Sequence, residues 1–297
     1  MNDLAVIILN YNTKDLLRKC INSVLDKKWK NNIEVWVVDN ASSDGSVEMV
    51  KKEFPKIKLI ISEENLGFAG GNNLALQKVH ADYYLLLNSD TKLTEGSLDN
   101  MLEAMEKNKF DIVSCKLVNA DDSLQPNVGD LPFGIALFSW LFGLDDLPYL
   151  KNLLPSFHRT AKNYYEDEKA VGWVSGTAFM ISKNVLKSIG LLDEKIFMYC
   201  EDVDYCIRSK GKGFVIGFTD KAIIKHIGGA SSEDPKLRQW LGEFRELIYL
   251  QRKYKGDFAA GTVKILIYIA ILVRILGFTF LGKINFVKTY GKILFKL

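Results

Sequence analysis

IEVWVVDNASSDGS, residues 33–46, joins an apolar, β-branched run to a cluster of short polar side chains. The run predicts a strand, and the Asp, Asn and Ser residues are typical of a turn that leads into a helix. Similar apolar runs occupy residues 4–9, 57–61, 83–87 and 110–115, with amphipathic segments between several of them. Strands that alternate with helices predict an α/β fold in which a parallel sheet is covered by helices.

Polar motifs directly follow four of these predicted strands. In open parallel sheets, ligands bind beyond the carboxyl ends of the strands. We therefore expect one functional site at this edge, formed by Asn10-Tyr11-Asn12, Asp39-Asn40, the loop that begins at Asn65, and Asn88-Ser89-Asp90.

Two of the motifs suit a nucleotide. The Asp39 carboxylate can accept the imide proton of a uracil or thymine ring, although a well-capped turn explains the same residues. Residues 65–73, NLGFAGGNN, form a glycine-rich loop whose backbone N–H groups can hold a phosphate at a helix N-terminus. The loop matches neither the dinucleotide fingerprint nor the P-loop, and a structural tight turn is its alternative.

A metal site is predicted after the run at residues 83–87. Asn88 and Asp90 are two residues apart, so their side chains can face one site with oxygen ligands suited to Mg²⁺ or Mn²⁺. The alternative is that Asp90 caps a helix beginning near Thr94. His226 ends another apolar run, and its imidazole suits Mn²⁺-like ions, with a structural histidine as the alternative.

Residues 201–204, EDVD, place three carboxylates within four positions. The helix dipole favours acids at a helix start, which gives a purely structural alternative. A hydroxyl group that acts as a nucleophile needs a nearby carboxylate to accept its proton, and Asp202 can be this base. Asp204 can pair with Arg208 four residues later, which leaves Asp202 to face the site with Glu201 as its rival.

Together and in this order, these motifs resemble family 2 glycosyltransferases of the GT-A fold, especially their rhamnosyltransferase-like branch. The resemblance covers roughly residues 4–230. It rests on the full series of motifs in their order along the chain, which also includes Ser43-Asp44-Gly45 and Trp173-Val174-Ser175-Gly176. It implies a Rossmann-like, mostly parallel sheet flanked by helices, and an inverting transfer of a sugar from a nucleotide diphosphate.

The resemblance implies roles on the donor side of the site. Asp39 contacts the nucleobase, Asn88 lies near the ribose, and Asp90 with His226 binds the divalent cation, Mg²⁺ or Mn²⁺, that bridges the two phosphates. The usual D-x-D motif reads Asn88-Ser89-Asp90 here, so weaker metal binding is expected. The other residues expected to line the nucleotide-sugar pocket are Asn10, Asn12, Asn65, Gly67, Asn72, Ser89 and Glu201.

On the acceptor side, the resemblance implies that Gly176 shapes the pocket for the sugar and the acceptor. It also implies that Asp202 takes the proton of the acceptor hydroxyl while that hydroxyl attacks the anomeric carbon from the face opposite the diphosphate.

Residues 1–233 are expected to form the catalytic domain, with an apolar insertion at about 120–170 in which the alternation of strands and helices fails. Residues 234–297 are expected to form a C-terminal helical region. After the insertion, regular structure is expected to resume at residues 171–181, and strands are predicted near residues 214–218 and 222–226.

The C-terminal region is expected to associate with a membrane. Its apolar stretches at residues 265–273 and 275–281 are split by Arg274 and fall short of a spanning helix unless Arg274 is paired or snorkels to the surface. Helices at the membrane interface are therefore predicted. A helix packed on the protein's own core or on another subunit is the alternative.

The charge distribution also favours a membrane partner. The chain carries a net +3, but after Gly256 six basic residues stand against Asp257 alone, which gives the tail +5 and the rest −2. Nucleic acid would instead require basic residues on the body of the protein. The four cysteines lack C-x-x-C spacing, and residues 4–9 lack the length and basic start of a signal peptide, so the cytoplasmic side is expected.

The resemblance implies that L-rhamnose is transferred from dTDP-rhamnose, and the tail and the apolar insertion favour a lipid-linked or cell-surface glycan as the acceptor. UDP donors that carry a hexose or an N-acetylhexosamine are alternatives, because the residues of these motifs do not determine which sugar binds. A nucleotidyltransferase would need a basic, glycine-rich loop near the N-terminus, which Asn10-Tyr11-Asn12 lacks. A non-catalytic, membrane-bound scaffold of a glycan assembly complex is the remaining alternative.

Overall fold

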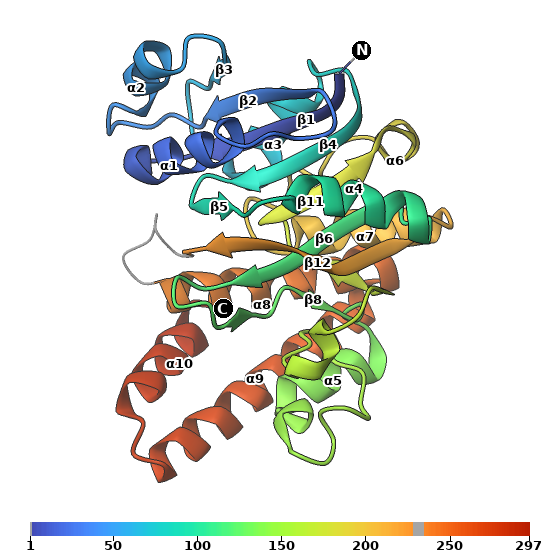
Figure 1. Cartoon of the computed structure of the whole chain (residues 1–297). Helices are drawn as coiled ribbons and strands as arrows, with labels where there is room; N and C mark the ends of the chain where they lie inside the picture. The colour runs from blue at the N-terminus through green and yellow to red at the C-terminus, as the bar shows by residue number, and fades with distance from the viewer. Residues whose placement is uncertain (1, 228–234) are drawn as a thin grey trace. The chain divides into compact units, whose positions relative to one another are not determined.

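The structure is a computed structural model that describes residues 2–227 and 235–297. The chain divides into two compact units (Figure 1). The first comprises Met1–Gly129 and Arg159–Ser231, and the second comprises Asp130–His158 and Ser232–Leu297. Much of the apolar insertion therefore belongs to the same unit as the C-terminal helices. The expected domain boundary at residue 233 lies outside the described residues.

The first unit is built on a mixed, mostly parallel sheet with the strand order β3-β2-β1-β4-β11-β6-β12-β5. The pairs β1–β2, β1–β4, β2–β3 and β6–β12 are parallel, whereas β11 and β5 are antiparallel to their neighbours. This topology confirms the predicted α/β class. β7 and β9 pair with β6 and β12 of this sheet, and β8 and β10 form a separate two-stranded sheet. The strands of both sheets are β1 (Asn2–Asn10), β2 (Ile33–Asp39), β3 (Lys58–Ile61), β4 (Ala81–Asn88), β5 (Thr91–Leu93), β6 (Ile112–Val118), β7 (Leu124–Gln125), β8 (Val128–Gly129), β9 (Lys169–Ala170), β10 (Trp173–Val174), β11 (Ala178–Ser182) and β12 (Ile216–His226).

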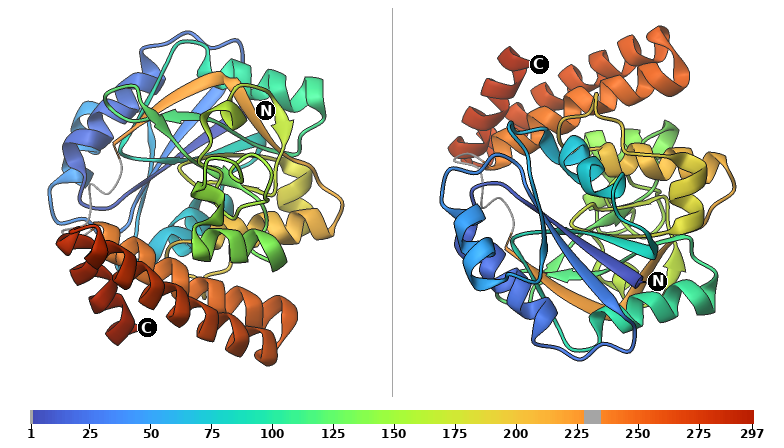
Figure 2. Two further views of the ribbon diagram at one scale, coloured as in Figure 1. Left: turned by 90° about the horizontal axis from the view of Figure 1, so that it is seen from below. Right: turned by 90° about the horizontal axis from the view of Figure 1, so that it is seen from above.

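Helices cover both faces of this sheet. Figures 1 and 2 show α1 and α4 on one face and α3 and α7 on the other. Alternate strand residues point to the same face, so Leu4, Val6 and Ile8 of β1 share a core with Leu17 and Ile21 of α1. The helices of this unit are α1 (Lys14–Leu25), α2 (Ser46–Glu53), α3 (Gly67–Leu76), α4 (Ser97–Asn108), α6 (Lys183–Ile189) and α7 (Glu201–Gly211), with the 3-10 turn η2 (Lys162–Tyr165).

Two details of the sheet refine the sequence-based expectation. The strands expected at residues 214–218 and 222–226 form the single strand β12, because a register shift between Thr219 and Ile223 lets its pairing with β6 continue. The segment at residues 171–181, where regular structure was expected to resume, contains the two strands β10 and β11. Residues 175–177 connect the two strands and place Gly176 at a turn rather than inside a strand.

The second unit consists mainly of helices. Its α9 runs unbroken through Arg274, whereas the sequence predicted two stretches split by this residue. By length and composition α9 is apolar enough to cross a membrane, with a mean hydropathy of 2.2 in its most apolar window. The helices are α5 (Gly134–Phe142), α8 (Pro235–Lys255), α9 (Asp257–Phe280) and α10 (Ile284–Lys296), with the 3-10 turn η1 (Leu144–Asp146).

The Arg274 side chain is satisfied within the second unit. Its guanidinium donates to the Tyr290 hydroxyl and to the Trp140 carbonyl oxygen, each at 2.8 Å. It also lies 5.6 Å from the centre of both rings, within the range of a cation–π contact. The Arg274 guanidinium therefore connects α9 to α5 and α10.

In the first unit, Asp44 caps two helices at once. Its Oδ2 accepts the Lys14 backbone N–H at 2.7 Å at the start of α1, and its Oδ1 accepts the Ser46 N–H at 3.0 Å at the start of α2. Thr13 precedes α1 but makes no cap bond. Burial acts to raise the pKa of Asp44, but hydrogen bonds from the Ser46 hydroxyl and the two backbone groups outweigh it and lower this pKa.

We expect Asp44→Asn to lower the free energy of unfolding near neutral pH by about 1 kcal/mol, because an amide has one oxygen for two helix starts. A lowered folded-state pKa gives stability that is present above the unfolded-state pKa and is lost as the pH falls through the folded-state value. Urea unfolding at a series of pH values should therefore show the two proteins converging in acid. The exposed Asp26→Asn is the control, and a pH-independent difference for Asp44→Asn would contradict the assignment.

Candidate active site

The turn after β2 is held by Asn10 and Asp39. Asn10 Nδ2 donates to Asp39 Oδ2 at 2.8 Å and to Ser42 Oγ at 3.0 Å, while Asp39 Oδ1 accepts the Ser42 N–H at 2.8 Å. Asp39 is 1% exposed. Both carboxylate oxygens thus fix the turn, and each keeps lone-pair capacity for a further donor.

Asn12 belongs to the same turn. Its side-chain Oδ1 accepts the Ser43 N–H at 2.8 Å, and its own backbone N–H donates to Ser42 Oγ at 2.9 Å. Asn12 is exposed and has a φ of +53°, a conformation that asparagine tolerates better than most residues. The structure therefore places Asn10, Asn12 and Asp39 in one hydrogen-bonded group.

The glycine-rich loop is clamped by Asn40, to which the sequence assigned no separate role. Asn40 Nδ2 donates to Asn65 Oδ1 at 2.9 Å and to the Gly67 carbonyl oxygen at 3.0 Å. Its Oδ1 accepts the Leu66 N–H at 3.0 Å. Only the position of Asn40 directly after a strand indicated such a function.

Gly67 lies where the loop meets the segment before α7. Its φ is +71°, and a Cβ atom there would lie 2.1 Å from the Phe197 carbonyl oxygen, which accepts the Phe68 N–H at 2.8 Å. Neither the conformation nor the space admits a side chain.

Asn72 and Asn73 of α3 face different environments. Asn73 holds the segment after α6 by two hydrogen bonds to the Leu192 backbone. The Leu192 N–H donates to Asn73 Oδ1, and Asn73 Nδ2 donates to the Leu192 carbonyl oxygen, each at 3.0 Å. Asn72 Nδ2 donates to the Phe68 carbonyl oxygen at 2.9 Å, and its buried Oδ1 has no hydrogen-bond partner among the described residues. Asn72, predicted as a pocket residue, thus retains an unused acceptor.

A chain of hydrogen bonds connects the turn after β2 with the turn after β4. The Thr13 hydroxyl donates to Asn10 Oδ1 at 2.7 Å, so the Ser89 hydroxyl must be the donor in its own 2.7 Å contact with Thr13. Ser89 is next to Asp90. The structure therefore brings the Asp39 group and the Asn88-Ser89-Asp90 motif together.

Asp90 and His226 face each other at the ends of β4 and β12. Asp90 Oδ1 lies 3.2 Å from His226 Nε2, and the two side chains are 11% and 12% exposed. Asp90 does not cap a helix near Thr94, because α4 begins at Ser97 after Gly96. That alternative is wrong.

Gln125 of β7 fixes the His226 ring. Its Nε2 donates to Asn119 Oδ1 at 3.2 Å, so its Oε1 faces His226 Nδ1, at 2.6 Å. Nδ1 must then donate, and a neutral ring directs the lone pair of Nε2 at a carboxylate. Two acceptors at this distance repel unless a proton or a cation lies between them. Sequence analysis missed Gln125, because it lies within the segment assigned to the insertion.

This donor set fits a cation that takes further ligands from outside the protein. Asp90 and His226 supply one oxygen and one nitrogen, and among residues 2–227 and 235–297 no group of three or more His, Cys, Asp or Glu side chains is placed to hold a metal. Mg²⁺ commonly uses one or two protein carboxylates together with water and substrate phosphates.

Asp202 lies at the start of α7 and contacts the turn that contains Gly176. Its Oδ2 accepts the Gly176 N–H at 2.7 Å. A Cβ atom on Gly176 would lie 2.9 Å from the Phe68 ring, so the glycine lets the glycine-rich loop approach this turn. Next to it, the Thr177 carbonyl accepts the Asn88 N–H at 3.0 Å, which connects the Asp202 group to the turn after β4.

The three acids of α7 differ in their surroundings. Asp204 is fully buried and pairs with Arg208 at 2.8 Å, which confirms the predicted ion pair. Glu201 is 4% exposed, whereas Asp202 is only partly buried. Asp202 is thus the most accessible of the three carboxylates.

Residues 5–190 match the family described as Glycosyl transferase family 2. The chain is 26% identical over 221 residues to the low-salt glycan biosynthesis hexosyltransferase Agl10 of Haloferax volcanii, a match that covers 73% of this chain and 64% of the relative. It is 22% identical over 270 residues to an N-acetylglucosaminyl-diphospho-decaprenol L-rhamnosyltransferase of Mycobacterium tuberculosis, covering 86% of this chain and 87% of that protein.

Solved structures share the fold. They include S. aureus TarS 1-349 in complex with UDP, with a TM-score of 0.53 at 18% identity, and GalNAc-T7 with UDP, GalNAc and Mn²⁺, with a TM-score of 0.60 at 14% identity. The matches cover 91% and 85% of this chain, and 65% and 48% of those chains. They confirm the expected GT-A fold.

We expect Gly67→Ala to lower the free energy of unfolding by at least about 2 kcal/mol, because it adds a left-handed alanine and a clash with Phe197. Gly211→Ala is the matched control, since that glycine ends α7 with open space around its Cβ position. Chemical denaturation measures both. Equal stability of Gly67→Ala and the wild type would show that the loop does not need the observed approach.

Proposed function

Because this chain belongs to glycosyl transferase family 2, we propose that it is an inverting glycosyltransferase that takes a sugar from a nucleotide diphosphate. The main support for the proposal is that two clusters of side chains at the strand ends are connected by a hydrogen bond. Asp90 faces His226 in one group, Asp202 bonds Gly176 in the other, and Asn88 connects them through Thr177. One group suits a diphosphate and the other a nucleophilic hydroxyl.

The nucleotide is proposed to bind beside the turn after β2. Asp39 accepts the imide proton of the base, Asn10 and Asn12 hold the turn around it, and the loop that contains Asn65 and Gly67 lines the pocket. Asn72 is fully buried and holds the start of α3 through the Phe68 carbonyl oxygen, behind this loop. Asn88 and Ser89 lie next to the metal ligand and suit the ribose.

Asp90 and His226 are proposed to hold Mg²⁺ or Mn²⁺. When bound, this cation offsets the negative charge that develops on the leaving diphosphate. Gln125 keeps Nδ1 of His226 protonated and leaves Nε2 to bind the ion, an arrangement common among metal-ligating histidines. Asn88 replaces an acid, so the protein contributes less negative charge to this site.

Asp202 is proposed to be the base. The acceptor oxygen forms a bond to the anomeric carbon, the bond from that carbon to the diphosphate breaks, and the hydroxyl proton moves to Asp202. The Gly176 N–H holds the carboxylate in place through Oδ2. Asp202 is favoured over Glu201 because it is more accessible, while Gly176 shapes the adjoining sugar and acceptor pocket.

L-rhamnose from dTDP-rhamnose is the proposed donor, in line with the named activity of the mycobacterial relative. UDP donors that carry a hexose or an N-acetylhexosamine are the alternative, since TarS and GalNAc-T7 were solved with UDP. Donor hydrolysis across a panel of nucleotide sugars decides between them, because hydrolysis needs no known acceptor.

The proposed acceptor is a lipid-linked or growing surface glycan, used in cell-wall or other polysaccharide synthesis at the cytoplasmic side of the membrane. Support comes from the second unit, where α9 exposes Ile265, Leu276 and Phe280 to 62%, 71% and 93%. The tail also carries a net +5, which suits anionic lipid headgroups. Peripheral attachment is proposed because one face of α9 is buried within its own unit, at residues that include Ala260, Ile267 and Ile271.

We expect Asp202→Asn to lower kcat by roughly 10²- to 10⁴-fold, because the amide cannot accept a proton. Nucleotide affinity should stay unchanged, and thermal unfolding reports any loss of the Gly176 hydrogen bond. Glu201→Gln is the matched variant. If it lost more activity than Asp202→Asn, the base would be Glu201.

We expect Gln125→Ala to weaken Mn²⁺ binding about 10- to 100-fold in the presence of UDP or dTDP, because the His226 ring loses its orientation. Electron paramagnetic resonance of free Mn²⁺ gives the affinity. The exposed Gln77→Ala is the control. Unchanged affinity in Gln125→Ala would show that His226 does not bind the ion.

A further inference from the structure

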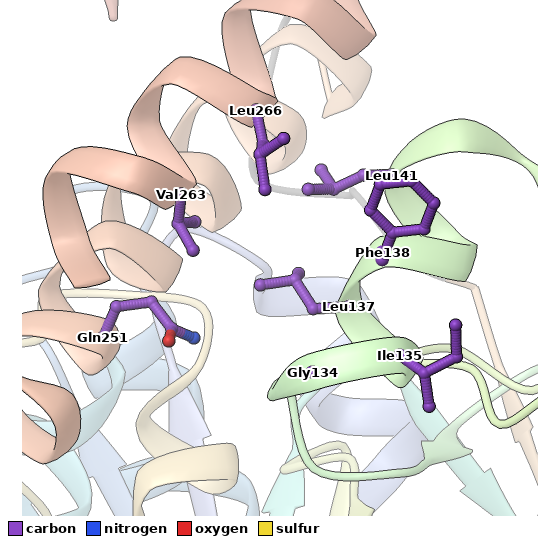
Figure 3. A pocket seen from close by; sticks show the side chains of 8 residues that line it. All are labelled: Gly134, Ile135, Leu137, Phe138, Leu141, Gln251, Val263 and Leu266. Atoms are coloured by element: carbon purple, nitrogen blue, oxygen red, sulfur yellow. The ribbon is translucent and has the colours of Figure 1, made fainter.

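The second unit contains a cavity of about 390 Å³ between α5, α8 and α9 (Figure 3). Ligand pockets in proteins commonly measure about 300 to 1,000 Å³. The side chains around it come from two segments more than one hundred residues apart in sequence. They are Gly134, Ile135, Leu137, Phe138, Leu141, Gln251, Val263 and Leu266.

The lining is apolar except for one side chain. Gln251 is 4% exposed, and its Nε2 donates to the Pro132 carbonyl oxygen at 2.6 Å. This bond directs the amide N–H to the protein backbone. Figure 3 shows aliphatic and aromatic side chains of α5 and α9 on facing sides of the cavity. Such a lining suits a hydrocarbon and offers little to a sugar or a nucleotide.

The cavity continues onto an exposed apolar surface. Two of its lining residues, Ile135 and Phe138, are 52% and 40% exposed and mark the open side. On α9, Leu266 begins a stripe with spacings of three and four residues, so its members share one helix face. From Leu266 to Phe280 the stripe extends roughly 21 Å at 1.5 Å per residue. The exposed members are Ile269, Val273, Leu276 and Phe280.

Positive charge lies next to the cavity. Gln251 lines it, and the last turn of α8 directly after Gln251 carries Arg252, Lys253 and Lys255, of which Arg252 pairs with Asp257 at 2.8 Å. Lys255 Nζ lies 5.2 Å from the centre of the Phe133 ring, and Phe133 precedes the lining residue Gly134. The surface beside an apolar pocket thus suits an anionic headgroup.

We propose that this pocket binds the hydrocarbon chain of the lipid that carries the glycan acceptor, with the phosphate of that lipid beside the basic end of α8. The proposal rests on the proposed function, since it names the part of the acceptor that the second unit recognises. A flat membrane surface would not fill a concave cavity. A single chain fills it and continues along the stripe from Leu266 to Phe280.

Binding is tested with the full chain in detergent micelles and a fluorescent long-chain alkyl probe. We expect decaprenyl phosphate to displace the probe from the wild type. Leu266→Trp should weaken displacement at least about tenfold, the loss expected when a few methylene groups are kept out of an apolar pocket. Ile265→Trp is the matched control, because this neighbour is 62% exposed and does not line the cavity.

A second variant guards against misfolding of the first. Ile135→Trp fills the cavity from α5 at a position that is 52% exposed, and it should weaken displacement in the same way. Equal displacement from the pocket variants and the wild type would overturn the proposal. Equal displacement by phosphatidylglycerol would also overturn it, because the pocket would then bind bulk lipid.

Kinetics separate this proposal from the proposed function. With N-acetylglucosaminyl-diphospho-decaprenol as acceptor, Leu266→Trp should raise KM and leave kcat unchanged. With the same headgroup on a short alkyl chain, both constants should match the wild type. Equal changes with both acceptors would overturn the pocket assignment. If the wild type transferred sugar to neither acceptor but decaprenyl phosphate still displaced the probe, the proposed acceptor would be wrong. The result would still support binding of a long hydrocarbon chain in the pocket.

Discussion

The rest of the site depends on the contact between the Asp90 carboxylate and the His226 imidazole. Gln125 orients the ring so that Nε2 points at a carboxylate oxygen 3.2 Å away. Without a shared proton or cation, this contact would be repulsive. The arrangement requires β4, β7 and β12 to end at one place, so the sheet topology and the chemistry of the site are connected through three side chains.

Buried polar side chains hold the loops around this pair. Asn10, Asn40 and Asn73 each join two segments, and Asp44 caps two helices. Asn40, Asn73 and Asp44 bond backbone N–H or carbonyl groups at strand and helix ends, whereas Asn10 bonds the side chains of Asp39 and Ser42. The loops after the strands are therefore fixed by the protein itself, which lets them present a preformed site to a donor.

The part of the fold that depends on local sequence patterns could be predicted from the sequence. β-branched runs at residues 33–38 and 83–87 gave strands, and the polar residues after them came together as parallel topology requires. The sequence was insufficient where long-range packing decides. The bulge that fuses two predicted strands into β12, and the approach of Gln125 to His226 over 101 residues, leave no local signal. The continuous α9 was missed because Arg274 finds its partners in Trp140 and Tyr290, far away in sequence.

We propose that the Asp90 and His226 pair binds a cation together with a nucleoside diphosphate. Calorimetric titration of UDP and dTDP into the wild-type chain, with and without Mn²⁺, tests it most directly. We expect Mn²⁺ to tighten binding of the nucleotide and His226→Ala to remove this dependence. Equal affinity with and without Mn²⁺, or no binding of either nucleotide, would contradict it.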